Sequence, residues 1–185
     1  MIEVNDESGY TPAIDVQEIS ELASWALEQM RVHPGADLNV VFVDEASMAD
    51  LHLRWMDLEG PTDVMSFPMD ELRPAPPGVE PKEGILGDIV VCPEVAGVQA
   101  RKAGHAPMEE ILLLVTHGML HLLGYDHATP EQRAEMFALQ RQLVLEFLAR
   151  KPRNPNDPSP EWVAQLIDEV APVIERVMPS EGRES

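Results

Sequence analysis

The segment from Pro107 to His127 constrains the fold more than any other part of this sequence. Most of it, MEEILLLVTHGMLHLL, is apolar on nearly every side, and a helix of that composition is normally buried at the centre of a domain. Within the segment, His117 and His121 are four residues apart and therefore project from the same face of a helix. The chain is thus expected to fold around one buried helix that presents two histidines.

A glycine and a third histidine follow this helix. Gly124 is suited to leave the helix in a left-handed conformation, and the turned chain can bring His127 back toward the first two histidines. Converging imidazoles at His117, His121 and His127 predict one Zn²⁺ per chain, with the fourth tetrahedral position left for water or substrate. A lone histidine in an apolar helix is usually a hydrogen-bonded core residue, but three at these spacings favour the metal.

The spacing matches the metzincin pattern H-E-x-x-H-x-x-G-x-x-H in its histidines and its glycine. It differs at the glutamate that acts as general base, because that position is Gly118 here. Conventional peptide hydrolysis is therefore not expected, although another metal-dependent hydrolase stays an alternative. Asp126 is a candidate for orienting a ligand imidazole or accepting a proton, and a turn-capping role is an equally good interpretation.

Length, charge and cysteine content narrow the class of protein. With 185 residues, 44% of them hydrophobic, the chain suits one domain with a substantial core. The formal net charge of -20 opposes nonspecific nucleic-acid binding, since phosphate binding normally draws on a basic surface. A local groove can still be basic, and the candidates for it are Arg54, Arg101, Lys102, His105 and Arg133.

The sequence predicts a cytoplasmic protein. Its first residues lack a signal-peptide pattern, and no apolar run approaches the roughly 20 residues needed to span a bilayer. The single cysteine, Cys92, cannot form an internal disulfide, and its setting in IVVCP suggests a buried strand residue.

Periodicity predicts an α+β fold. Helices are expected at 13–33, with Asp15 as N-cap, and at 46–56, 93–104, 108–123 and 129–150; strands are expected at 1–4, 38–45, 63–70 and 85–92. These elements predict a single domain, 1–150, in which a small mixed β-sheet of about four strands packs against helices and the metal site lies on the central buried helix. Residues 151–185 are interpreted as a linker plus a C-terminal helical extension.

Three motifs in the order PTDVMSFP, LGDIVVCP and HGMLHLLGYDH resemble the YbeY family of metal-dependent endoribonucleases. The resemblance covers residues 40–150. It implies an α+β domain, a zinc-like metal at the three histidines, and a single-strand-specific endoribonuclease in ribosomal RNA maturation and small-subunit quality control. The partners that it implies are ribosomal RNA, the small ribosomal subunit with one of its proteins, and a ribosome-assembly GTPase, with no membrane.

The resemblance also assigns residues around the metal. The family's cleft-bordering strand is matched by Thr62, Asp63, Ser66 and Phe67. Gly87 and Asp88 match the start of the next motif, whose acidic residue is linked with partner binding.

One position departs from the family. Many members carry an arginine, implicated in RNA hydrolysis, six residues before the threonine, and here that position is Met56. Arg54 is a weak substitute because it would point elsewhere on a helix. The candidate catalytic residues are therefore His117 and, more weakly, Asp126 and Arg54.

A non-catalytic ribosome-assembly factor is the main alternative from another class. In that protein zinc would hold the fold, and both the net charge and Met56 favour it. The number of ligands favours catalysis, because structural zinc sites are usually closed by four protein ligands. For a nuclease, attack by a metal-activated water and attack by the ribose 2′-hydroxyl both stay open.

Overall fold

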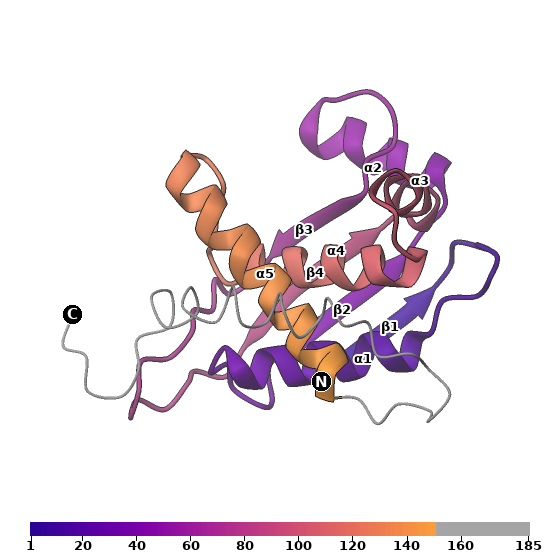
Figure 1. Cartoon of the computed structure of the whole chain (residues 1–185). Coiled ribbons are helices and arrows are strands. Elements are labelled where there is room, and N and C mark those ends of the chain that lie inside the picture. The colour runs from indigo at the N-terminus through magenta and orange to yellow at the C-terminus, as the bar shows by residue number, and fades with distance from the viewer. Residues whose placement is uncertain (151–185) are drawn as a thin grey trace.

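Four strands form one mixed sheet whose spatial order differs from their order in the sequence. The strands are β1 (Ile2–Asp6), β2 (Asp37–Phe42), β3 (Val64–Pro68) and β4 (Ile85–Val91), arranged β1-β2-β4-β3. β2 is parallel to both β1 and β4, whereas β3 runs antiparallel to β4 at the edge. This computed structural model describes residues 1–150 (Figure 1). The predicted α+β fold with a small mixed sheet is confirmed.

Five helices complete the fold. They are α1 (Val16–Gln29), α2 (Glu45–Met56), α3 (Pro93–Ala103), α4 (Pro107–Leu122) and α5 (Pro130–Arg150). α4 contacts the sheet through β3 and β4 and also contacts α1, α3 and α5, so it is the central helix, as expected (Figure 1). α5 packs on α4 and α1, and it forms the layer farthest from the sheet.

The two faces of the sheet carry different cores. On the face toward α1 and α4, side chains such as Leu38, Val40 and Ile89 belong to the main hydrophobic cluster. The opposite face carries a smaller cluster that α2 covers through Met48, which is fully buried against neighbours including Val90. Alternation along the strands therefore supplies both cores.

α4 is buried along most of its surface. Its buried residues include Ile111, Leu112, Leu114, Val115, Met119, Leu120 and Leu122. The partly exposed positions Leu113, His117 and His121 follow one another at intervals of four, so they form one stripe that faces the cleft described below. The two histidines thus lie at the boundary between the core and solvent.

The expected helix caps are present. The Asp15 carboxylate accepts a 3.1 Å hydrogen bond from the backbone N–H of Glu18. The Thr129 hydroxyl accepts one from the N–H of Gln132, and the Gln132 side chain accepts one from the N–H of Thr129, both at 3.2 Å. This reciprocal pair is a capping box, so the sequence located the start of α5 correctly.

Some expectations differ from the structure. The first helix is shorter than 13–33, because Asp15 caps its start and Arg31 has a positive φ of 56° just beyond its end. Val16, the first residue of the helix, is 37% exposed. Cys92 is buried but lies one residue past β4, at the N-cap of α3.

Two further expectations concern the membrane and the C-terminal segment. Among residues 1–150, no helix combines the length and the apolar character that crossing a membrane requires. The expected linker and helical extension at 151–185 lie outside the described residues.

Candidate metal centre

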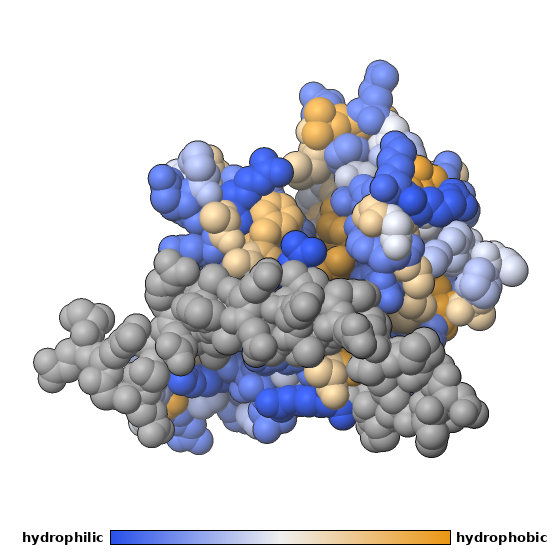
Figure 2. Space-filling model, in the orientation of Figure 1, coloured by the Kyte–Doolittle hydropathy of each residue, from blue (hydrophilic) through white to orange (hydrophobic). Residues whose placement is uncertain are grey.

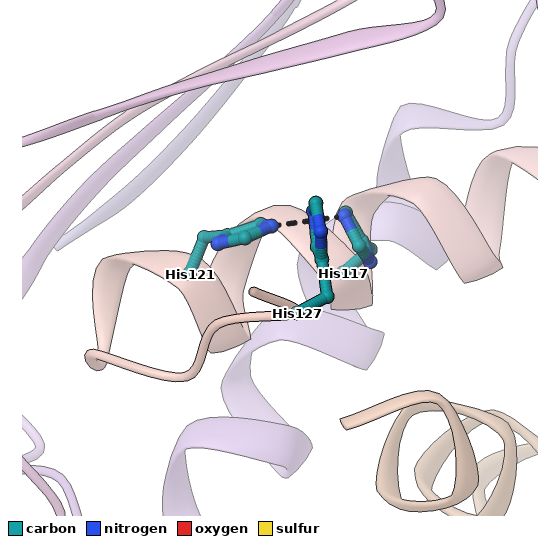
Figure 3. Close-up of side chains that lie close together, drawn as sticks. All are labelled: His117, His121 and His127. Carbon is teal, nitrogen blue, oxygen red and sulfur yellow. Dashed lines mark hydrogen bonds between the residues drawn. The ribbon is translucent and has the colours of Figure 1, made fainter. Parts of the chain in front are cut away.

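Three histidine side chains meet near the C-terminal end of α4. His117 and His121 come from the helix, and His127 comes from the turn that follows it (Figure 3). One ligand-capable atom from each side chain lies within 4.8 Å of those of the other two. The Nε2 atoms of His117 and His121 are 3.1 Å apart. The histidines singled out by their spacing are thus brought together, and the cluster could hold a metal ion.

The turn that returns His127 to the cluster depends on Gly124. The N–H of Gly124 donates a 3.0 Å hydrogen bond to the carbonyl of His121, and its φ is +97°, a region that favours glycine. A Cβ at this position would also come within 2.6 Å of the guanidinium carbon of Arg73. Glycine is therefore favoured here by the backbone conformation, whereas the flexible Arg73 side chain could move away from a larger residue.

Gln140 of α5 fixes the orientation of His117. Its side-chain oxygen accepts a 2.7 Å hydrogen bond from Nδ1–H of His117. Because Nδ1 then carries the proton, Nε2 presents a lone pair toward His121, as a metal-ligating imidazole requires. Gln140 is 9% exposed, so this hydrogen bond is largely shielded from water.

The surroundings keep two of the imidazoles neutral. Burial lowers the pKa of His117, and the hydrogen bond to Gln140 and the negative charge of Asp63 oppose that shift only in part. Burial also lowers the pKa of His121, assisted by the neighbouring histidines and opposed by Asp126. Neutral imidazole is the form that binds a metal, so both side chains are in the ligating form at neutral pH.

An aromatic ring from α5 lies against the cluster. Phe137 stacks on His117 at 5.6 Å between ring centroids and on His127 at 6.4 Å, with interplanar angles of 25° in both pairs. The guanidinium of Arg133 lies 5.4 Å from the centre of the Phe137 ring, on its face. This stacking restricts the rotation of both imidazoles and shields part of the cluster from water.

The histidines line a cleft of about 820 Å³. Its walls come from α2, β3, α4, the turn after α4, and α5. Figure 2 shows the molecule hollowed between the N-terminal part of α5 and α2, with hydrophobic surface inside the hollow. The size of the cleft suits one or two nucleotides or another small polar substrate.

The two weaker catalytic candidates have different positions. Asp126 lines the cleft, and its carboxylate accepts a 2.7 Å hydrogen bond from the backbone N–H of His127. It therefore caps its own turn, and the orienting contact to an imidazole comes from Gln140 instead. Arg54 does not line the cleft, since its guanidinium pairs with Asp50 at 2.6 Å on the exposed side of α2.

The expected basic groove is not formed in this cleft. In the part of the chain that the structure describes, none of the residues that line the cleft is lysine or arginine. His105 instead bonds the carboxylate of Glu110, and Arg133 lies over Phe137. Arg101 and Lys102 lie in the last turn of α3, away from the cleft lining.

Met56 does line the cleft. It is the last residue of α2, and its side chain is 59% exposed. Met56 therefore lines the same cleft as the histidines, and it presents a thioether instead of the charge that the resemblance implies at this position.

The packing around Gly118 explains why this chain lacks the glutamate of the metzincin pattern at position 118. A Cβ at this position would lie 2.9 Å from Cγ2 of Ile89 and 3.1 Å from Oγ of Ser66. The Gly118 carbonyl also accepts a 3.3 Å hydrogen bond from the Ser66 hydroxyl. Position 118 therefore packs directly against β3 and β4, where a glutamate side chain has no room.

The residues of the first matched motif border the cleft, as the resemblance implies. Thr62, Asp63, Ser66 and Phe67 all line it. Asp63 is held in place, because its carboxylate accepts hydrogen bonds from the N–H of Val64 at 2.7 Å and from the Gln99 side chain at 3.2 Å.

Gly87 and Asp88 of the second motif lie elsewhere. Both are on β4 and line a separate hollow beside Asn39 and Glu3, at the other end of the sheet from Val91 and the start of α3. Asp88 pairs across the sheet with Phe67 of the cleft-bordering strand.

Sequence reasoning missed Gln140, Phe137 and Trp55. Gln140 and Phe137 come from α5. The sequence held a signal for Gln140, because it is a polar residue on the face that also buries Met136 and Leu143. A buried glutamine beside an apolar stripe indicates a specific hydrogen-bond partner.

Comparison with known proteins agrees with this geometry. The family model described as "Endoribonuclease YbeY" matches residues 3–148. Proteins named "Endoribonuclease YbeY" include one from Kineococcus radiotolerans, 58% identical over 161 residues, which cover 86% of this chain and 92% of that protein. One from Mycolicibacterium smegmatis is 58% identical over 150 residues, covering 80% of this chain and 83% of that protein.

A solved structure shares the fold. The solution structure of a protein from Thermotoga maritima superposes with a TM-score of 0.55 at 26% identity, and the match covers 85% of this chain and all of that one. The histidine cluster, the three motifs and the matched family model together establish that this chain belongs to the YbeY family.

Proposed function

We propose that this protein is a single-strand-specific, metal-dependent endoribonuclease that acts in ribosomal RNA maturation and small-subunit quality control. The observation that carries the proposal is the convergence of His117, His121 and His127 within 4.8 Å in a cleft of about 820 Å³. Membership of the YbeY family supports RNA as the substrate.

Zinc is the ion that this set of donors fits best. Three neutral imidazoles suit Zn²⁺, and the protein supplies no fourth ligand in the cluster found among residues 1–150. When bound, zinc supplies a Lewis acid for a phosphoryl oxygen and lowers the pKa of a coordinated water to about 7. We propose one Zn²⁺ per chain.

The protein's own residues position the reaction. Gln140 holds His117 in the tautomer that presents Nε2, and Phe137 restricts the rotation of His117 and His127. Asp126 lines the cleft beside the cluster and is the proposed proton acceptor. Since Arg54 points away from the cleft, no catalytic role is assigned to it.

The proposed partners are ribosomal RNA, the small ribosomal subunit with one of its proteins, and a ribosome-assembly GTPase. A formal net charge of -20 suits contact with a basic ribosomal protein better than contact with bare RNA. We therefore propose that a protein partner brings this chain to its RNA.

The test is RNA cleavage by metal-free, zinc-loaded and His117→Ala protein, purified without a histidine tag and free of contaminating nuclease. The proposal predicts about one zinc per wild-type chain, cleavage of single-stranded RNA only when zinc is present, and loss of both zinc and cleavage in His117→Ala. His33→Ala is the matched control and should keep both zinc and cleavage, because His33 belongs neither to the histidine cluster nor to the cleft lining.

The non-catalytic alternative gives a different result. A ribosome-assembly factor would bind zinc and unfold at a lower temperature without it, yet the zinc-loaded protein would leave every single-stranded RNA intact. Absence of zinc from the wild-type protein would contradict both functions.

A further inference from the structure

The most exposed aromatic side chain among the described residues of the cleft lining is a tryptophan. Trp55, in the last turn of α2, is 64% exposed and lines the same cleft as His117. Its ring meets that of Phe67 edge-on, with 5.7 Å between centroids and an interplanar angle of 69°. This contact leaves most of the indole surface open to solvent.

The charges around the cleft limit how RNA can be held there. Among residues 1–150, the lining includes the acidic residues Asp63, Glu110 and Asp126, and it includes no lysine or arginine. Met56, which also lines the cleft, carries no charge. Apart from the proposed Zn²⁺ at the histidines, the described lining therefore offers no cationic side chain of the kind that usually contacts RNA phosphates.

Base stacking is the binding interaction that this lining does offer. Trp55 and Phe67 lie on the α2 and β3 side of the cleft, and Phe137 lies on the α5 side, stacked on His117. Aromatic side chains bind bases by stacking without any requirement for a particular sequence. Stacking requires a base that is free of its own neighbours, so such a site accepts single strands and rejects duplexes.

We propose that Trp55 is a stacking platform for one unpaired nucleobase of the RNA held in the histidine cleft, and that it helps to make the site specific for single strands. This inference rests on the proposed endoribonuclease function. Trp55 would contact the base next to the phosphate that lies at the histidines, so it is a substrate-binding residue and not a residue of the metal site.

The experiment combines a change in the protein with a change in the RNA. Zinc-loaded, full-length protein is titrated with a labelled, short single-stranded RNA under conditions in which the RNA stays intact, and the same RNA is prepared with one abasic nucleotide at each position in turn. Trp55→Ala should weaken binding of the intact RNA about 5- to 100-fold, and Trp55→Phe should keep most of the affinity.

The abasic RNA decides whether Trp55 contacts a base. For the wild-type protein, one abasic position should weaken binding by a factor similar to that of Trp55→Ala. Combining that abasic RNA with Trp55→Ala should give little further loss, because both changes remove the same contact. If the affinity losses from Trp55→Ala and from the abasic nucleotide multiply at every RNA position, Trp55 does not stack on a base of this RNA.

Leu53→Ala is the matched control. Leu53 is 51% exposed on the same helix but does not line the cleft, so this variant should bind RNA like the wild type. Zinc content and thermal unfolding should be unchanged in Trp55→Ala, since this exposed side chain contributes little to the core.

The outcomes separate this inference from the proposed function. If zinc-loaded wild type cleaves RNA and Trp55→Ala binds and cleaves it with unchanged affinity, the stacking role is wrong while the nuclease function stands, and Trp55 is then free to anchor a protein partner. If wild type neither binds nor cleaves RNA, both the nuclease function and the stacking role are wrong.

Discussion

The side-chain oxygen of Gln140 and Nδ1 of His117 are 2.7 Å apart, and this hydrogen bond joins α5 to α4. The bond places the proton of the His117 ring on Nδ1 and leaves Nε2 free to bind a metal. Because Gln140 is buried, water cannot easily take its place as the hydrogen-bond acceptor. Because of this bond, the orientation of the His117 ring depends on how α5 packs against α4.

Replacing Gln140 is expected to weaken metal binding. Gln140→Leu removes the acceptor while keeping an apolar side chain of similar size, so His117 loses its fixed tautomer and zinc affinity should fall about 10- to 100-fold. Gln140→Glu keeps an acceptor and should retain affinity. Competition with a chromophoric chelator measures both variants, and equal zinc affinity in wild type and Gln140→Leu would remove the orienting role.

Met56→Arg is expected to alter RNA binding without loss of zinc. The guanidinium would enter the cleft from an exposed position, where it can pair with a phosphate. Affinity for single-stranded RNA should rise, and the slope of log K against log salt should steepen by about 0.7. Leu53→Arg is the control, because it adds the same charge outside the cleft. If Leu53→Arg raises RNA affinity as much as Met56→Arg does, position 56 does not face the RNA.

Gly118→Ala is expected to destabilise the domain. The added methyl would meet Ile89, which is fully buried on β4 and cannot move freely. Overpacking of this kind destabilises by about 1–3 kcal/mol, against a gain of about 1 kcal/mol in helix propensity. Denaturant unfolding should show a net loss in the free energy of unfolding. In the Gly118→Ala, Ile89→Ala double variant the loss should be less than the sum of the two single losses, because the shorter side chain at position 89 makes room for the added methyl. A more stable Gly118→Ala protein would show that the helix can shift.

Cys92 is expected to be unreactive in the native protein. Burial raises the pKa of its thiol, so the reactive thiolate forms at a higher pH in the folded than in the unfolded chain. The free energy of unfolding should therefore fall as the pH rises above the unfolded thiol pKa of about 8.5. Labelling with a thiol reagent at pH 8 should be slow in buffer and complete in guanidinium chloride, whereas rapid labelling in buffer would indicate local opening at the start of α3.

Removal of residues 151–185 is expected to preserve the fold and the metal site. Both hydrophobic clusters described here consist of residues before 151, and the family match ends at 148. The protein truncated after Arg150 should unfold cooperatively and bind about one zinc. Loss of cooperative unfolding or of zinc would show that the domain requires residues 151–185.

Much of this architecture was accessible from local sequence patterns. The polar residue before α1, the capping box before α5 and the burial of α4 follow from interactions within a few residues, and so does the return of His127 through Gly124. The convergence of the histidines was therefore predictable, because all three belong to one helix and the turn after it.

The order of the strands and the lining of the cleft were not accessible in this way. Periodicity indicates which face of a strand is buried but not which strand lies beside it, so the insertion of β4 between β2 and β3 was not predicted. Gln140 is 23 residues from His117, and its partner is defined only by the packing of α5 on α4. Trp55 likewise reaches the site only because α2 ends beside β3.

The contact of Gly118 with Ile89 and Ser66 also limits which substitutions this fold can accept during evolution. A mutation to glutamate at position 118 would complete the peptidase motif in the sequence, but the new side chain would collide with the sheet before reaching the histidines. Acquiring peptidase chemistry would first require smaller residues on β3 and β4 or a lifted helix, each destabilising alone. One tight helix–sheet contact thus separates two enzyme classes whose metal-binding motifs differ at a single position.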